Sequence, residues 1–230
     1  KISDGIHTTP NYDDNGNFYF VNGNNLVDGI IKIDEKTKRV NESEYIKHKR
    51  DLNQNTILLS INGTIGNISF YNNENIVLGK SACYINVDDK LLDKYFIYNQ
   101  FKTKSVLNFF YSEITGSTIK NLSLTTIKNT KIKLPSKLEQ EKIASFLTSV
   151  DTKIEQLTKK ETLLQEYKKG VMNKIFNQEI RFKDDDGSEF PEWEEKILKE
   201  QCINIYSGKT KPKENGKFNV YGSTGIIGKS

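Results

Sequence analysis

Apolar residues recur at alternating steps of four and three along one stretch of the chain, residues 136–176. The series consists of Ile143, Leu147, Val150, Ile154, Leu157, Leu164, Val171 and Ile175, and only Glu161 and Lys168 interrupt it. This heptad pattern predicts a single long helix with a narrow apolar seam. At about 1.5 Å per residue the helix would be roughly 60 Å long. Such a helix cannot bury its own seam, so the pattern also predicts a partner helix.

The beginning of this helix carries local signals. Pro135 cannot continue a helix backwards, and Ser136 followed by Glu139 is typical of a capping box. Phe146 and Tyr167 lie beside the seam and are candidates for packing against a partner. The simpler alternative is a helix that serves only as an oligomerisation stalk.

Before the helix, the chain is β-rich. Short apolar runs lie at 18–21, 30–33, 56–61, 65–71, 76–78 and 82–87. Clusters of Asn, Gly and Asp, which are typical of turns, separate them. They predict a compact mixed sheet or partial barrel. From residue 88 the period changes, which predicts a helix capped by Asp88 or Asp89 and a second short helix around Val106 and Phe110.

A polar loop, a one-turn helix and a strand at 131–134 are expected next, before the long helix. The charged segment 181–193 has the composition of a linker, and a β-like pattern resumes after it. The predicted fold class is therefore α+β, a β-rich globular domain followed by a long coiled-coil helix. We expect domain boundaries at 1–134 (globular domain), 135–183 (helical spacer and linker) and 184–230 (a further segment).

This further segment has features of the first domain. Gly16-x-Phe18 matches Gly216-x-Phe218, and the sequence at 2–10 parallels that at 205–212. We interpret this as a weak repeat of about 200 residues. The end of the sequence would then be the opening of a second copy of the first domain.

The composition restricts the compartment and the kinds of ligand that we expect. The 230 residues are 35% hydrophobic, and no run is long enough to span a membrane. Cys83 and Cys202 suggest no disulfide framework, and His7 and His48 have no metal-ligand spacing with them. We therefore expect a cytoplasmic protein with no metal and no cofactor. The net charge of +4 permits a nucleic-acid partner without requiring one.

The sequence contains no nucleophile–base pair and no setting for paired catalytic carboxylates, so catalysis by this chain is not expected. Gly228-Lys229-Ser230 resembles the end of a phosphate-binding loop. The position five before Gly228 is Ser223 rather than glycine, so the spacing favours a glycine-rich hairpin. A nucleotide-binding enzyme is kept only as an alternative.

Basic residues interleaved with aromatic and hydroxyl side chains are the positive signal. Lysines suit phosphate contacts, while Thr, Asn and Ser suit contacts to base edges. The candidate DNA-binding residues are His7, Thr8, Thr9, Thr64, Lys102, Lys104, Ser117, Thr118, Lys120, Lys209, Lys211 and Tyr221. A solvated, lysine-rich surface explains the same composition equally well. The sequence Gly63–Gly66 is also typical of a simple hairpin turn.

At the helix junction the pattern becomes specific. Leu134-Pro135, Glu139-Gln140, Ile143-Ala144, Leu147, Asp151 and Ile154 resemble the spacer helix of type I restriction-modification specificity subunits. The segment 168–176, Pro191-x-Trp193, the motif at 2–10, Gly63–Gly66 and the Gly116-Ser117 loop are also similar to that family. The resemblance spans nearly the whole chain.

The resemblance implies a non-catalytic DNA-recognition subunit. Residues 1–134 would be a target-recognition domain that reads half of a bipartite site in double-stranded DNA, and 184–230 would open a second one. The implied partners are methyltransferase subunits, which carry the S-adenosylmethionine site, nuclease/translocase subunits, and a second spacer helix. The chain would be either a fragment or a half-length subunit that pairs with another copy. The alternative is a coiled-coil interaction protein with a non-DNA ligand.

Overall fold

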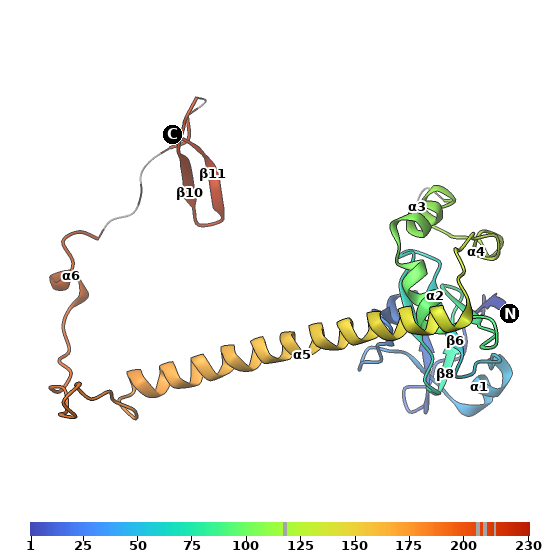
Figure 1. Ribbon diagram of the computed structural model, residues 1–230, viewed down its shortest axis with the longest axis horizontal. Helices are drawn as coiled ribbons and strands as arrows, with labels where there is room; N and C mark the ends of the chain where they lie inside the picture. The colour runs from blue at the N-terminus through green and yellow to red at the C-terminus, as the bar shows by residue number, and fades with distance from the viewer. Residues whose placement is uncertain (117–118, 206–207, 209–210, 214) are drawn as a thin grey trace. The chain divides into compact units, whose positions relative to one another are not determined.

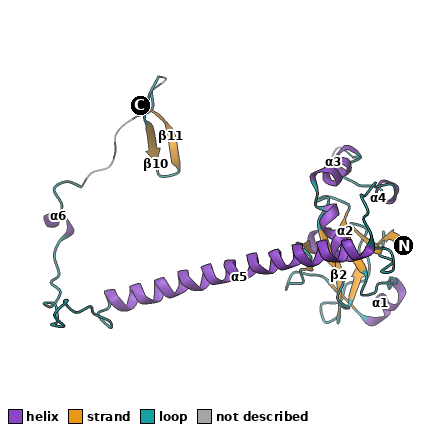
Figure 2. Ribbon diagram, viewed as in Figure 1, coloured by secondary structure: helices purple, strands orange, loops and turns teal. Residues whose placement is uncertain are grey.

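The computed structural model describes residues 1–116, 119–205, 208, 211–213 and 215–230. Contacts divide the chain into two units, Lys1–Leu164 and Gln165–Ser230. The division falls inside the long helix α5 (Lys137–Phe176), which follows a domain of short strands and helices (Figures 1 and 2). The predicted α+β class, with a β-rich domain before a long helix, is confirmed.

The strands of the first unit form two larger sheets and one two-stranded hairpin. The larger sheet has the order β1-β9-β6-β7 with antiparallel neighbours: β1 (Ile2–Asp4), β9 (Ala82–Asn86), β6 (Thr56–Ser60) and β7 (Ile68–Phe70). The smaller sheet has the order β5-β2-β8: β5 (Arg39–Val40), β2 (Phe18–Val21) and β8 (Ile76–Leu78). β2 and β8 are parallel, and β3 (Leu26–Val27) and β4 (Ile30–Ile31) form a separate hairpin.

The larger sheet is buried on both faces. Along β6, Ile57 and Leu59 face one apolar cluster, whereas Leu58 between them faces another. The first cluster includes side chains from α2 (Lys94–Phe101), α3 (Lys104–Ser112) and α4 (Leu124–Lys128). Because side chains alternate between the faces of a strand, a strand buried on both faces needs an unbroken apolar run. This explains the unbroken apolar run at 57–59, which lies between the buried polar residues Thr56 and Ser60.

Several sequence predictions are wrong in detail. α2 is capped by Asp93, which accepts a hydrogen bond from Phe96 N. Asp88 instead accepts from Lys90 N in a local turn, and neither Asp88 nor Asp89 caps the helix. Residues 131–134, predicted as a strand, belong to no strand and pair with none among the described residues. β7 begins at Ile68 rather than at residue 65, because Gly63–Gly66 forms a turn.

One helix, α1 (Glu42–His48), was not predicted. Asn41 caps it by accepting a hydrogen bond from Glu44 N at 3.0 Å. Glu44 is buried, and its carboxylate accepts hydrogen bonds from the backbone and side-chain nitrogens of Asn11. Asn followed three residues later by Glu is a helix-start signal, so the sequence did contain the information.

A buried glutamine attaches α5 to the domain. Gln140 is 1% exposed, and its side-chain oxygen accepts a hydrogen bond from Asp93 N at 3.0 Å. Its side-chain nitrogen donates to the carbonyl oxygens of Leu91 and Pro135. Ala144 is buried beside it and Ile143 packs against the same core cluster. Ser136 accepts from Glu139 N, as expected of the predicted cap.

The seam of α5 is therefore used in two ways. Ile143 packs against the chain's own domain, and Leu147 is half-buried. Further along, Val150, Ile154, Leu157 and Leu164 are 41–56% exposed, and Val171 and Ile175 are partly exposed. The pairing of this later part of the seam stays a prediction.

The second unit contains an ordered turn where a linker was predicted. Gln178 adopts a φ of 60° after the last turn of α5, and its backbone nitrogen donates to Ile175 O. Arg181 then bridges the segment: it pairs with Glu192 at 2.8 Å and donates to the carbonyl oxygens of Phe190 and Pro191. Short helix α6 (Leu198–Gln201) precedes the hairpin of β10 (Asn219–Gly222) and β11 (Gly225–Lys229).

This hairpin repeats the hydrogen bonding of β2 and β5. Asp13 N donates to Arg39 O, and Lys213 N donates to Lys229 O. Gly16 and Gly216 both lie where a Cβ atom would collide with the opposite strand. Phe18 pairs with Val40, and Phe218 N donates to Ser230 O. The repeat inferred from the sequence therefore has a counterpart in local structure.

We expect Gln140→Ala to destabilise the first unit. Each buried polar group left without a partner costs about 1–3 kcal/mol, and the substitution removes partners from three backbone groups. The free energy of unfolding, measured by urea denaturation, should fall by about 2 kcal/mol or more. Gln156→Ala is the matched control, since Gln156 is exposed on the same helix. Equal losses of unfolding free energy in the two variants would contradict the conclusion that Gln140 attaches α5 to the domain.

We expect the two cysteines to differ in reactivity. Burial raises the pKa of the Cys83 thiol to about 12. Since the thiolate is the reactive form, Cys83 should resist a thiol reagent at pH 8 until the protein unfolds. Cys202 is only partly buried and should react in the native state. If a Cys202→Ser variant still reacts rapidly, the remaining Cys83 is accessible, and its side chain is not buried in the core as described.

Candidate nucleic-acid interface

Several turns meet at one end of the larger sheet. Gly79, Lys80 and Ser81 connect β8 to β9. Ile6 lies beside Gly79, and Ile6 N donates to Leu78 O at 2.7 Å, which brings the loop at 7–9 next to this connection. On the other side, Asn62 donates from its side-chain nitrogen to Lys80 O at 3.4 Å. Three segments that are distant in sequence thus adjoin.

The Gly63–Gly66 turn extends this surface. Gly63 and Gly66 have φ values of 72° and 92°, a region that favours glycine. Gly63 N donates to Lys120 O at 3.0 Å, and Asn121 forms a backbone bridge with Asn62. The loop that contains Lys120 therefore lies against the turn that presents Thr64.

We call the exposed side chains of these segments the turn surface. It comprises His7, Thr8, Thr9, Asn62, Thr64, Lys80 and Lys120, all exposed except the partly buried Asn62. The His7 ring is hydrogen-bonded to Asp4 at 2.8 Å, which fixes its position. The surface thus combines ammonium, hydroxyl, amide and imidazole groups, and these are the groups that contact phosphates and base edges.

Lys102 and Tyr111 lie beside the turn surface. With Gly66 and Leu107 they line a pocket of about 200 Å³. The Lys102 ammonium is 3.0 Å from the Tyr98 hydroxyl oxygen and 3.7 Å from Asp28. The hydrogen bond to Tyr98 raises the pKa of Lys102, which keeps the side chain charged. Lys102 is therefore cationic, but its charge is partly compensated by Asp28.

The structure brings together only part of the predicted set. His7, Thr8, Thr9, Thr64 and Lys120 lie on the turn surface, Lys102 borders it, and Lys104 is exposed at the first position of α3. Lys211 and Tyr221 are exposed in the second unit. Ser117, Thr118 and Lys209 lie outside the described residues. Among the residues that are described, no three His, Cys, Asp or Glu side chains are placed to hold a metal ion.

Asn62, Lys80 and Asn121 were missed by the sequence predictions. Each follows or precedes a strand or turn, but no local pattern indicates that their segments meet. The contacts arise from sheet pairing between residues about 20 to 60 positions apart. Only the glycines at 63 and 66 marked the position of one turn.

Comparison with known proteins identifies relatives. A family model described as "Type I restriction modification DNA specificity domain" matches residues 5–165. The specificity subunit of the type I restriction enzyme MjaVIII of Methanocaldococcus jannaschii is 30% identical over 84% of this chain and 44% of its own length. The MjaIX specificity subunit of the same organism is 29% identical over 71% of this chain and 39% of its own. The chain thus spans less than half the length of these relatives.

Two solved structures have the same fold. A chain from a study of assembly and conformational transition of the type I restriction-modification system superposes with a TM-score of 0.52, covering 76% of this chain and 43% of that chain at 16% identity. The HsdS subunit of Thermoanaerobacter tengcongensis superposes with a TM-score of 0.50, covering 73% and 45% at 15% identity. No helix among the described residues is both long and apolar enough to cross a membrane.

Proposed function

Because the chain belongs to the family of type I restriction-modification DNA specificity domains, we propose that it recognises DNA sequence for a restriction-modification complex. The family is defined by specificity, and the chain is the non-catalytic, recognising part. Methylation and cleavage would belong to methyltransferase and nuclease/translocase subunits that assemble with it. The observation that carries the proposal is the family match over residues 5–165, together with the turn surface inside that range.

The turn surface would read one half-site in double-stranded DNA. Thr64, Asn62 and His7 offer hydroxyl, amide and imidazole groups that suit base edges. Lys80 and Lys120 flank them and suit phosphate oxygens. The surrounding backbone is held by strand pairing, so the side chains project from fixed positions. A rigid base for polar side chains is what sequence-specific contacts require.

The helix α5 would set the spacing and bind partners. Its 40 residues correspond to about 60 Å, which is between one and two turns of DNA at about 34 Å per turn. The exposed part of the seam would pack against a second spacer helix, from another copy or from a further segment. Phe146 and Tyr167 are 67% and 70% exposed beside it and would contact the methyltransferase.

The proposed function assigns a role to each part of the chain. Residues 1–134 would form the target-recognition domain, 135–183 the spacer and linker, and 184–230 the opening of a second recognition domain. The repeated hydrogen bonding of the β2–β5 and β10–β11 pairs supports the last assignment. The cytoplasm is the compartment in which such a complex would meet DNA.

The proposal predicts that Asn62→Ala and Thr64→Ala reduce sequence preference. Each lost base contact should lower discrimination by about 1–3 kcal/mol, or roughly 5- to 150-fold in the ratio of specific to non-specific binding. The measurement is fluorescence anisotropy with a duplex selected from a random library by the unaltered chain and with a scrambled duplex.

Asn55→Ala is the matched control for Asn62→Ala. Both asparagines are partly buried and each donates one side-chain hydrogen bond, but Asn55 bonds to Asp89 near the opposite end of β9. Its variant should retain full preference. Loss of preference in this control, or retention of it in both test variants, would place the reading surface elsewhere.

A second prediction concerns the seam. Ile154→Asp combined with Leu164→Asp should abolish helix pairing, because two charges cannot be buried in an apolar seam without partners. The assembly state, measured by light scattering of the purified chain and of its complex with a co-expressed methyltransferase, should fall to that of unpaired subunits. Gln156→Asp with Thr162→Asp adds the same charge to another helix face and should leave assembly intact. An unchanged assembly in the seam variant would refute the pairing.

A further inference from the structure

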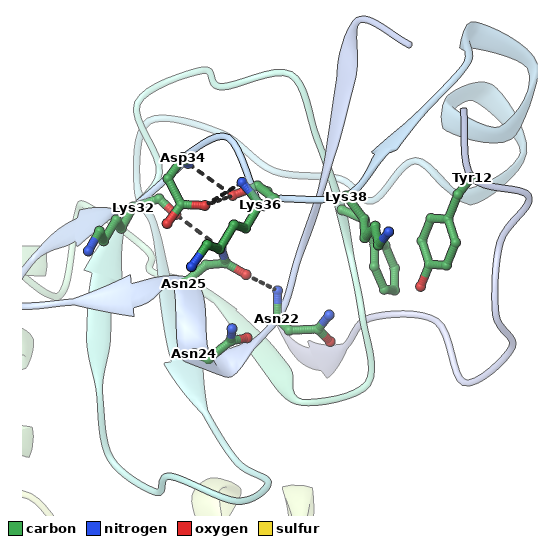
Figure 3. A pocket seen from close by; sticks show the side chains of 10 residues that line it. Tyr12, Asn22, Asn24, Asn25, Lys32, Asp34, Lys36 and Lys38 are labelled. Atoms are coloured by element: carbon green, nitrogen blue, oxygen red, sulfur yellow. Dashed lines mark hydrogen bonds between the residues drawn. The ribbon is translucent and has the colours of Figure 1, made fainter. Parts of the chain in front are cut away.

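A polar pocket of about 310 Å³ lies outside the residues assigned above. It is lined by Tyr12, by Phe20 near the end of β2, by the turn after β2 and by the segment that leads to β5. Figure 3 shows lysine and asparagine side chains gathered around it. Lys32, Lys36, Lys38 and Asn24 are exposed, and Asn22 and Asn25 are partly buried.

The pocket is fixed beside the turn surface. The Ser81 hydroxyl donates to the Asn22 side-chain oxygen at 2.9 Å, and Gly23 N donates to the Ser81 hydroxyl at 2.9 Å. A Cβ atom on Gly79 would lie 2.2 Å from the Asn22 side-chain oxygen, so a larger residue here would displace the Asn22 side chain. Asn22 in the pocket and Lys80 on the turn surface are thereby held next to the same short connection.

The charge of the pocket is positive. Three lysines and one aspartate line it. Asp34 is engaged locally, since its carboxylate accepts hydrogen bonds from Lys36 N and from the Thr37 hydroxyl. Among the described residues, none of the three lysines forms a salt bridge. Lys38 lies over the Tyr12 ring at 5.9 Å, which holds its ammonium group at the pocket.

The asparagines make a rigid base. The Asn25 side-chain nitrogen donates to Lys32 O at 3.0 Å, and its side-chain oxygen accepts from Asn22 N at 2.9 Å. These bonds tie the turn after β2 to the segment that carries the lysines. Uncompensated ammonium groups around a fixed polar base suit an oxyanion bound from solvent.

We propose that this lysine pocket holds a backbone phosphate of the same duplex that the turn surface reads. This inference rests on the proposed function. The pocket continues the turn surface through Ser81 and Gly79, so one duplex can lie across both. Lysines act as point charges toward phosphates and carry no sequence information in that role. The pocket therefore adds affinity and register, while the turn surface supplies preference.

The test is the salt dependence of DNA binding by the full chain with Lys36→Ala and Lys38→Ala combined. Each phosphate contact contributes about 0.9 to the slope of log K against log salt. The slope should fall by about 1, and affinity at low salt should fall by about tenfold or more. The sequences selected from a random duplex library should be the same as for the unaltered chain.

Lys1→Ala with Lys90→Ala is the matched control. It removes the same charge, but both residues lie at the other end of β9, where Lys1 N donates to Asn86 O and Lys90 N donates to Asp88. Its slope should stay close to that of the unaltered chain. Lys36→Arg with Lys38→Arg should also keep the slope, and thermal melting should show that every variant is folded.

The outcomes separate the two proposals. If the unaltered chain prefers a sequence but both double alanine variants change the slope equally or not at all, the phosphate pocket is refuted and the proposed function stands. If the Lys36 and Lys38 variant selects different sequences, the pocket reads bases and the inference is wrong. If the unaltered chain binds all duplexes alike, both proposals fail.

Discussion

The buried amide of Gln140 is the interaction on which the architecture depends. It joins the first turn of α5 to the carbonyl of Leu91 and to the backbone nitrogen of Asp93, the residue that caps α2. A polar group at 1% exposure is stable only when its hydrogen bonds are made, and here all of its bonds go to backbone atoms. Backbone partners define the direction in which the helix leaves the domain more closely than apolar packing alone would.

The strand β9 lies between the turn surface and the site where Gln140 attaches α5. β9 begins beside Gly79–Ser81, where the turn surface lies, and ends at Asn86, from which the chain runs to the Gln140 site. Its side chains Cys83 and Ile85 face one core cluster and Tyr84 the other. The strand is therefore buried on both faces and cannot slip by one residue without exchanging its two cores. The attachment site of the helix and the proposed recognition surface lie at opposite ends of this strand, so substitutions in the turns need not disturb the attachment of the helix.

The sequence was informative where structure is local. The heptad series and Ser136 predicted α5 almost to the residue, and apolar runs located β2, β6, β8 and β9. It failed where several local solutions compete: Asp88 and Asp93 are both suitable caps, and Asp93 is the one that also contacts Gln140 and Lys137 of α5. The site was predicted in part, since glycines marked the turn at Thr64. Lys80, Asn62 and the lysines near Asn22 were not found, because pairing of distant strands brings them together.

The repeated hairpin indicates how the exposed side chains of this fold can vary while its backbone pairing stays the same. The bonds from residue 13 to residue 39 and from 213 to 229 are equivalent, and a glycine follows three positions later in both copies. The side chains on this common backbone differ: Tyr12 and Lys38 of the first copy correspond to Pro212 and Gly228 of the second. Backbone hydrogen bonds do not depend on side-chain identity, so the pairing persists while the exposed groups vary. Two segments with the same backbone would then present different chemistry, as the proposed reading of unlike half-sites requires.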